Sequence, residues 1–362
     1  MVEWIAMKNL FSIKNGYTPS KKQKEYWNGG TIPWFRMEDI RQNGTILKDS
    51  IQHITPLGVK KGGLFPANSI IVATTATIGE HALIIVDSLA NQRFTFLVKC
   101  KSYDSKLDMK YMYYYMFIVD EWCKKNTNVS GFASVDMDKF KKLLIPIPSL
   151  AEQNRIVVIL DTFTASIDNL KEQIALRRKQ FEYYREQLLD LEGKPGVEMK
   201  TLGEICSKIT SGKNKSKTKE GLYPVFGSTG IIAYTDDYIF DKPLILVARV
   251  GANAGYVNLS YGKCDVTDNT LVISLKENVI LKYIFHCLVK ENINKYAKGG
   301  GQPLITASIL KSLLIALPSI SEQERIVSIL DTFEASISNL EAQLEQRQKQ
   351  YEYYRNKLLT FE

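Results

Sequence analysis

Residues 148–157 read PSLAEQNRIV, and residues 318–327 read PSISEQERIV. The match continues without a gap, so that 28 of the 45 positions in 148–192 are identical to their counterparts in 318–362. Upstream it fades, through 143–145 with 313–315, back to Gly131 with Gly301. A long repeat of this kind indicates two copies of one structural unit. We therefore expect a globular domain at 1–148, a helix at 149–192, a second globular domain at 193–318 and a second helix at 319–362.

Each repeated segment has the pattern of a long amphipathic helix. Both begin with an S-x-x-E capping box, 149–152 and 319–322, in which the serine accepts from the third helical amide and the glutamate reaches back. Apolar residues then follow at alternating spacings of four and three, which is typical of a coiled coil. Arg177 and Arg347 interrupt the pattern at equivalent places and are interpreted as polar register residues. The expected seam consists of Ile156, Leu160, Phe163, Ile167, Leu170, Ile174, Ile326, Leu330, Phe333, Ile337, Leu340 and Leu344.

The connection between the repeats limits how the helices pair. The turn 193–196, GKPG, ends the first helix and leads directly into the second domain. Helices that pair within one chain must then run antiparallel, as a rod of about 60 Å with one domain at each end and a pseudo-twofold axis between them. Two alternatives stay open, namely packing of each helix on its own domain and pairing between different chains.

The globular segments have the pattern of α+β domains. Short β-rich runs at 69–73, 82–86 and 94–98, and at 244–248 and 270–273, are separated by Gly, Asn and Asp turns. One helix follows in each domain, at about 108–125 and 280–296, with Tyr113 and Tyr283 as a shared tyrosine. We expect the tyrosines of 111–115 to lie in the helix core and not to stack on bases. The fold class is thus two α+β domains joined by two long helices that form an antiparallel coiled coil.

Composition excludes several classes of protein. With 45% hydrophobic and 24% charged residues, the chain is neither disordered nor collagen-like. Five scattered cysteines without a C-x-x-C, and only three histidines, argue against a metal site and fit a reducing cytoplasm. The N-terminus lacks a secretory signal pattern, and no apolar run approaches the ~20 residues of a membrane span. No nucleotide-binding, methyl-transfer or nucleophile-triad motif stands out, so we expect a binding protein without catalytic residues.

The charge distribution points to a polyanionic ligand. The net charge is +8 overall, with +7 in 1–148 and +6 in 193–318, whereas the two helical segments carry −2 and −3. Lysine- and glycine-rich segments lie between the expected strands, for example 60–63 and 211–219. Lysine neutralises phosphates and glycine allows close approach of the backbone. Each run alone is typical of a solvated loop, but together they favour nucleic acid.

The repeat and several motifs resemble the specificity (S) subunits of type I restriction–modification systems. The resemblance covers essentially the whole chain. It is carried by the repeated PS-x-x-EQ-x-RIV segment, by LLIPIP at 143–148 and LLIALP at 313–318, and by GQPLI at 301–305. GGTIPWFRMEDI at 29–40 and TIG at 77–79 also look like family motifs, whereas the second domain has YPVFGSTG at 223–230 in place of the first. This difference indicates two subclasses of recognition domain.

The resemblance implies a function for each segment. Each globular segment would be a target-recognition domain that reads one half of a bipartite double-stranded DNA site. The helices would space the domains and dock two methyltransferase subunits, and restriction subunits could join. S-adenosylmethionine, and ATP with Mg, are expected on those partner subunits and not on this chain. The expected localisation is cytoplasmic.

The candidate DNA contacts are polar residues in the loops. In the first domain they are Lys21, Lys22, Arg36, Lys60, Lys61, Thr75, Gln92 and Arg93. In the second they are Ser211, Lys213, Lys215, Arg249, Asn253, Asn269, Lys298 and Gln302. One alternative is a coiled-coil adaptor that holds two protein-binding domains without touching DNA. Another is single-stranded RNA binding, which would need exposed aromatic residues for stacking.

Overall fold

A computed structural model describes residues 2–128, 133–215, 218–299 and 302–361. Gly131 and Gly301 of the repeat, and Ser216 and Lys217 of the lysine-rich run, lie outside these described residues. The chain divides into two compact units, one formed by 1–169 with 344–362 and the other by 170–343. Each unit thus combines one globular domain with the first part of one long helix and the last part of the other. Within the described ranges, no helix is long and apolar enough to cross a membrane.

The first unit is built on a sheet in the order β2-β9-β6-β7-β4, with a small sheet β5-β3-β8 beside it. Both faces of the larger sheet are buried, because α3 covers one face while α2 and the small sheet cover the other. The strands are β1 (Glu3–Ala6), β2 (Phe11–Asn15), β3 (Ile32–Phe35), β4 (Ile46–Leu47), β5 (His53–Ile54), β6 (Ser69–Ala73), β7 (His81–Ile84), β8 (Leu89–Ala90), β9 (Phe94–Lys99), β10 (Thr127–Asn128), β11 (Ser134–Val135) and β12 (Leu144–Ile147). The helices are α1 (Met7–Leu10), α2 (Met37–Asn43), α3 (Met109–Lys125) and α4 (Met137–Lys142).

The second unit repeats this plan with different connections. Its main sheet has the order β14-β21-β18-β19, and the sheet β16-β15-β20-β17 lies beside it. The strands are β13 (Glu198–Thr201), β14 (Cys206–Ser211), β15 (Tyr223–Gly227), β16 (Gly230–Thr235), β17 (Phe240–Asp241), β18 (Leu244–Ala248), β19 (Val257–Ser260), β20 (Lys263–Val266), β21 (Thr270–Leu275) and β22 (Leu314–Leu317). The short helices are α6 (Leu202–Ile205), α7 (Leu281–Glu291) and α8 (Ala307–Lys311).

The backbone pairing shows that the two domains share one topology. β1 pairs antiparallel with β12, and β13 pairs with β22 in the same register, because Ile147 and Leu317 are 170 residues apart. β6 lies between β7 and β9 just as β18 lies between β19 and β21. The sequence repeat, which fades upstream of the helices, therefore continues as a structural repeat through both domains. The α+β prediction is confirmed.

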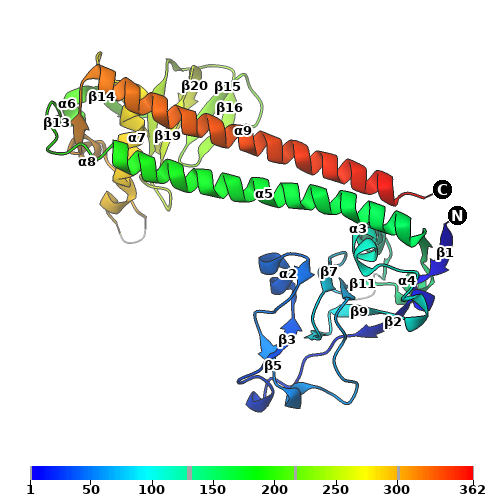
Figure 1. The fold of residues 1–362 in the computed structure, drawn as a ribbon. Helices are drawn as coiled ribbons and strands as arrows, with labels where there is room; N and C mark the ends of the chain where they lie inside the picture. The colour runs from blue at the N-terminus through cyan, green and yellow to red at the C-terminus, as the bar shows by residue number, and fades with distance from the viewer. Residues whose placement is uncertain (1, 129–132, 216–217, 300–301, 362) are drawn as a thin grey trace. The chain divides into compact units, whose positions relative to one another are not determined.

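The two long helices are α5 (Leu150–Leu188) and α9 (Ile320–Leu359), drawn in green and in orange to red in Figure 1. In the second unit Arg178 is paired with Glu341 at 2.6 Å, and Tyr184 stacks on Phe333 at 5.3 Å between ring centroids. Residue numbers rise along α5 as they fall along α9, so the helices are antiparallel here. In the first unit Phe163 stacks on Tyr354 at 5.4 Å, which is the repeat-equivalent pair. Arg177 and Arg347 lie over Phe333 and Phe163, each at 5.8 Å.

The start of each seam packs differently from the prediction. Ile156 and Leu160 are fully buried in the core of the first domain, together with Leu359 from the end of α9. Ile326 and Leu330 occupy the same place in the second domain, together with Leu189. These four residues therefore join a helix to a domain as well as to the other helix, because the apolar stripe passes over the domain before it leaves it. Among the other predicted seam positions, Ile167 and Ile174 are buried, and Leu170, Ile337, Leu340 and Leu344 are half-buried.

The first turn of each long helix is fastened by a buried glutamine. Gln153 Nε2 donates to Lys106 O at 2.7 Å and to Pro148 O at 2.8 Å, and its Oε1 accepts from Asp108 N at 2.8 Å. Gln323 likewise donates to Pro318 O and accepts from Ile280 N, at 2.9 and 3.0 Å. Both amides thus join α5 or α9 to the start of α3 or α7.

The predicted capping boxes are half right. Ser149 Oγ accepts from Glu152 N at 3.3 Å, and Ser319 Oγ accepts from Glu322 N at 3.4 Å. Each glutamate pairs with the arginine three residues later instead of reaching back, and the pairs are Glu152 with Arg155 and Glu322 with Arg325. A guanidinium within reach of a carboxylate makes a charge-assisted bidentate pair, which competes with the backbone amide.

The shared tyrosine is Tyr111 and not Tyr113. Tyr111 Oη donates to Pro146 O at 2.8 Å, and Tyr283 Oη donates to Ala316 O at 2.5 Å, which is the repeat-equivalent carbonyl. Tyr113 instead bonds with Thr45. The offset between α3 and α7 is therefore 172 and not 170. The tyrosines of 111–115 are buried in the helix core, as predicted.

Candidate nucleic-acid interface

In the first domain four candidate residues come from three separate loops that meet at one end of the sheets. Asn91 N donates to Phe35 O at 3.0 Å, which brings the loop of Gln92 and Arg93 beside Arg36. Thr74 N donates to Arg93 O at 3.1 Å, which places Thr75 next to the same loop. β3 and β6 end here and β9 begins, so that these backbone bonds hold the loops together.

The candidate lysines of the first domain lie on two further loops that meet at Tyr17. Tyr17 Oη accepts from Lys60 N at 2.7 Å, and Lys60 Nζ lies 4.5 Å from the centre of the Tyr17 ring. The adjacent Thr18 donates to Gln92 Oε1 at 2.5 Å, which links this region to the loop of Arg93. The eight candidates together form what we call the first loop surface, and its four lysines (Lys21, Lys22, Lys60 and Lys61) are exposed.

The second domain gathers its candidates at the equivalent end of its sheets. Arg249 N donates to Asn269 O at 2.8 Å, and Ile305 N donates to Arg249 O at 2.8 Å. Lys213 N donates to Val266 O at 2.9 Å, beside the same turn. Lys298 exchanges two backbone hydrogen bonds with Leu304, next to Gln302. We call Ser211, Lys213, Lys215, Arg249, Asn269, Lys298 and Gln302 the second loop surface.

Asn253 departs from this group. It lies on the β18–β19 loop and lines a cavity of about 290 Å³ against the C-terminal end of α7. The loop folds back on the domain because Gly255, with φ of +92°, packs against the backbone of Asn294. Its placement beside α7 therefore gives Asn253 weaker support as a DNA contact than the other candidates.

A glycine marks the start of each loop surface, and sequence reasoning missed it. A Cβ at Gly16 would lie 2.3 Å from Ala90 O, and a Cβ at Gly212 would lie 2.1 Å from Val266 O. Both glycines directly follow the first strand of the main sheet, β2 or β14. Aligning Asn15-Gly16 with Ser211-Gly212 would have extended the repeat to the loops. The same alignment would have nominated Thr18 and Asn214, which bond to Gln92 and to Asp265.

Two arginines at these surfaces are held by their surroundings. The Arg36 guanidinium lies 5.8 Å over the Trp34 ring and 3.9 Å from Glu38, with its side chain about a quarter exposed. Nε of Arg36 and Nε of Arg249 are buried and have no hydrogen-bond partner among the described residues. Anchored arginines that present their terminal nitrogens suit bidentate hydrogen bonding to a planar acceptor edge.

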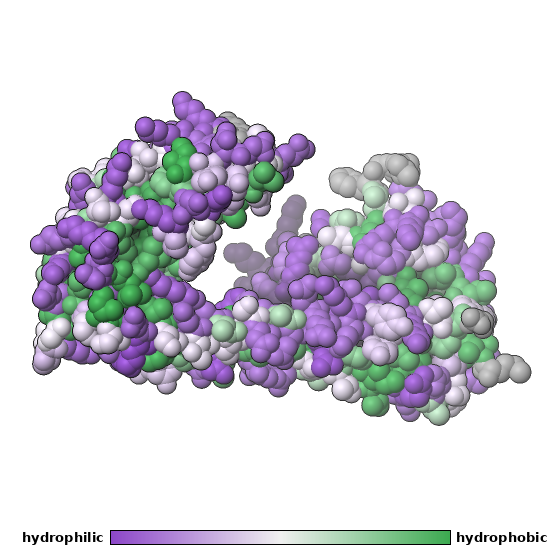
Figure 2. Space-filling view, turned by 90° about the horizontal axis from the view of Figure 1, so that it is seen from above, coloured by the Kyte–Doolittle hydropathy of each residue, from purple (hydrophilic) through white to green (hydrophobic). Residues whose placement is uncertain are grey.

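A second type of surface is apolar and is duplicated by the repeat. Tyr183 and Tyr353, near the ends of α5 and α9, are each 60% exposed. Leu144 on β12 and Leu314 on β22 are 52% and 61% exposed, beside Trp4 and Met199 on the paired strands. In Figure 2 hydrophilic side chains predominate on the visible face and hydrophobic ones form patches between them. Exposed apolar groups at repeated positions indicate two equivalent protein contacts.

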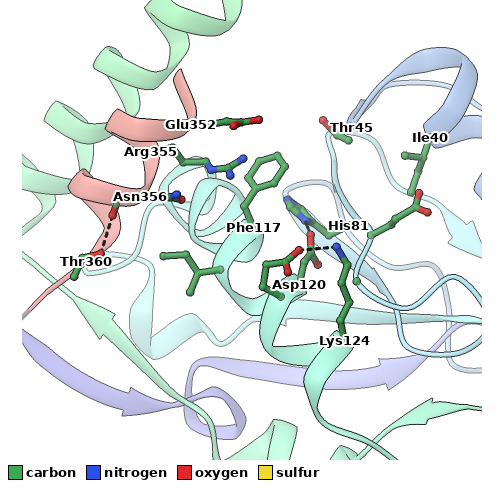
Figure 3. A pocket seen from close by; sticks show the side chains of 14 residues that line it. Ile40, Thr45, His81, Phe117, Asp120, Lys124, Glu352, Arg355, Asn356 and Thr360 are labelled. Atoms are coloured by element: carbon green, nitrogen blue, oxygen red, sulfur yellow. Dashed lines mark hydrogen bonds and ion pairs between the residues drawn. The ribbon is translucent and has the colours of Figure 1, made fainter. Parts of the chain in front are cut away.

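The largest cavity of the first unit contains a buried ion pair. It has a volume of about 720 Å³ and lies among α3, the strand β7 and the end of α9. His81 Nδ1 lies 2.5 Å from Asp120 Oδ2, and Figure 3 shows these side chains pointing toward one another. The second domain has Val257 at the strand position of His81, so this pair is not duplicated.

Comparison with known proteins agrees over the whole chain. A family model described as type I restriction modification DNA specificity domain matches residues 1–177 and 195–348. The EcoprrI specificity subunit of Escherichia coli is 44% identical, covering 94% of this chain and 89% of the relative. The EcoR124I/EcoR124II specificity subunit of Escherichia coli is 34% identical, covering 71% and 72%. The crystal structure of an S subunit from M. genitalium has the same fold, with a TM-score of 0.59, 17% identity and coverage of 100% and 97%.

Proposed function

Because this chain belongs to the family of type I restriction–modification DNA specificity subunits, we propose that each of its domains recognises one half of a split DNA site through its loop surface. The chain recognises a DNA sequence and acts in a complex with the other subunits of its system. The observation that carries the proposal is the duplication of a lysine-bearing loop surface at the same end of two equivalent sheets.

The two loop surfaces have the side chains that DNA recognition needs. The exposed lysines neutralise phosphates, which positions the domain without reading sequence. Arg36, Gln92 and Arg93 in the first domain, and Arg249 and Asn269 in the second, can form paired hydrogen bonds with base edges in the major groove. The two sets differ in residue type and in loop length. The two half-sites should therefore differ in sequence.

The duplicated apolar surface supports a matching arrangement of partners. Tyr183 with Tyr353, and Leu144 with Leu314, would contact two copies of the same subunit, since the repeat offers the same chemistry twice. We assign this contact to two methyltransferase subunits, and α5 and α9 to setting the length of the DNA spacer. S-adenosylmethionine would bind to the methyltransferase subunits, and ATP with Mg to restriction subunits. This chain would then be non-catalytic.

Paired charge variants test the proposal. Lys60→Gln with Lys61→Gln removes two exposed lysines from the first loop surface, and Lys141→Gln with Lys142→Gln removes two adjacent exposed lysines from α4 as a matched control. We expect the first pair to reduce the slope of log K against log salt by about 2 for binding of duplex DNA by the assembled complex, because each phosphate contact contributes about 0.9. The control pair should leave the slope unchanged.

Two results would overturn the proposal. Equal effects of the two pairs would mean that the loop surface does not face the DNA. An assembled wild-type complex that retains no duplex DNA at low salt would favour the adaptor alternative, in which both domains bind protein.

A further inference from the structure

The two domains differ most at the end of one equivalent strand. Phe35 O at the end of β3 accepts from Asn91 N, and Phe226 O on β15 accepts from Thr267 N at 2.9 Å. In the first domain residues 36–52, with α2 and β4, connect this strand to its antiparallel neighbour β5. In the second domain β15 turns directly into β16, so that only 228–229 lie between the strands. A bare hairpin tip thus stands where the first domain has a longer, partly buried connection.

The tip of this hairpin is tightly closed. Gly227 pairs with Gly230, which has φ of +96°, and Ser228-Thr229 form a two-residue loop. A Cβ at Gly227 would lie 2.7 Å from the side chain of Ile232, so the strands close together around a glycine. Two-residue loops hold the ends of a β-ribbon in one register. The polar side chains of Ser228 and Thr229 are therefore presented at a defined position.

The hairpin lies beside the second loop surface. Besides the bond from Thr267 N to Phe226 O, Thr267 forms a bridge with Asn214, and Lys213 N donates to Val266 O. β15 also runs parallel to β20, which leads into this turn, and Figure 1 shows β15, β16 and β20 together. The tip thus continues the surface of Lys213 and Asn269.

The exposed side chains of the hairpin are unusual for a solvated ribbon. Ile231 and Ile232 are 51% and 46% exposed, and Thr229 is exposed at the tip. Exposed lysines flank them, namely Lys213 and Lys215 near the tip and Lys263 on β20. The acidic groups nearby are Asp268 in the adjoining turn and Asp236 and Asp237 at the opposite end of the hairpin. Apolar side chains bordered by cations favour a polyanion that also has apolar groups.

We propose that the β15–β16 hairpin enters the major groove of the second half-site, with Ser228 and Thr229 on base edges and Ile231 against a thymine methyl group. The major groove accepts a two-stranded β-ribbon, and hydroxyl groups serve as donor and acceptor to bases. The flanking lysines would contact the phosphates on either side. This inference rests on the proposed function and names the specificity-determining element of the second domain.

The test uses the chain assembled with its methyltransferase subunits. Ser228→Ala with Thr229→Ala removes both tip hydroxyls, and Thr235→Ala at the other end of β16 is the matched control. We expect the tip variant to bind the wild-type site about 5- to 100-fold more weakly and to relax selection at one or two positions of one half-site, measured by selection from a randomised duplex library. The other half-site and the spacer should be unchanged, and Thr235→Ala should match the wild type.

The outcomes separate this inference from the proposed function. Wild-type selection of a split site, combined with identical selection by the tip variant, overturns the hairpin assignment and leaves the proposed function intact. Loss of methyltransferase assembly in the tip variant, measured by sedimentation, also overturns it, because the hairpin would then face a protein. A wild-type complex that selects no site refutes the proposed function itself. Ile231→Ala, which keeps the turn residues, provides a second variant that should lose preference for thymine at one position.

Discussion

Truncation of Gln153 tests how the long helices are joined to the domains. Its side-chain amide is fully buried and makes three hydrogen bonds with backbone groups, at 2.7 to 2.8 Å. Gln153→Ala leaves Asp108 N, Lys106 O and Pro148 O without these partners. A buried polar group that loses its partner costs about 1–3 kcal/mol, although relaxation and entry of water recover part of this. We expect a loss of about 3 kcal/mol in the free energy of unfolding.

The repeat supplies an internal comparison. Gln323 makes two such bonds, to Ile280 N and Pro318 O. Gln323→Ala should therefore cost about 2 kcal/mol, by the same reasoning about lost partners. Asn154→Ala, at the exposed neighbouring position, should change stability by less than about 0.5 kcal/mol.

Urea unfolding and amide hydrogen exchange of the full chain measure these effects. Gln153→Ala should speed exchange at Asp108 and leave Ile280 protected, whereas Gln323→Ala should do the reverse. If the Asp108 amide exchanges no faster in Gln153→Ala than in the wild type, the fastening role of the glutamine is refuted. A stability loss no larger than that of Asn154→Ala would lead to the same conclusion.

Three further predictions concern pH, loop packing and spacing. Burial, with Lys282 and Arg185 nearby, lowers the pKa of His286 to about 4; the unfolded state then binds more protons below about pH 6.5, so the stability of the second unit should fall by about 2–3 kcal/mol from pH 7 to pH 4, and His286→Gln should remove this slope in thermal unfolding. Gly212→Ala should cost about 1–3 kcal/mol in urea unfolding, whereas Gly62→Ala, which has open space around its Cβ, should cost little; equal costs would contradict the tight packing. Deleting one heptad from both α5 and α9 should change the spacer length in the recognised site, and an unchanged spacer in library selection would remove the helices from that role.

The repeat and the heptad pattern predicted the helices well because they depend on local periodicity. The same pattern did not show that Ile156 and Leu160 pack into the domain core, since an apolar stripe does not specify what covers it. The role of Gln153 was also missed, because a glutamine near a helix start is usually exposed. Its partners come from the start of α3, which only the tertiary structure brings close.

The loop surfaces were predicted in composition but not in arrangement. Lysine-rich loops pointed to a polyanion, yet nothing local indicates that Gln92 would meet Thr18 or that Arg249 would meet Asn269. These neighbours depend on which strands pair, and the strands are far apart in sequence. The assignment of Tyr113 as the shared tyrosine failed for a related reason, because a shift of two residues between α3 and α7 is invisible where the sequences have diverged.

The joint between helix and domain has a consequence for how such chains change. Gln153 and Gln323 contact main-chain atoms of the domain, which every amino acid except proline supplies in the same form. Substitutions across the rest of the domain therefore leave the joint intact, provided that the local backbone is kept. A lineage could exchange an entire domain for a foreign one in a single recombination event and obtain a new target sequence without redesigning the scaffold.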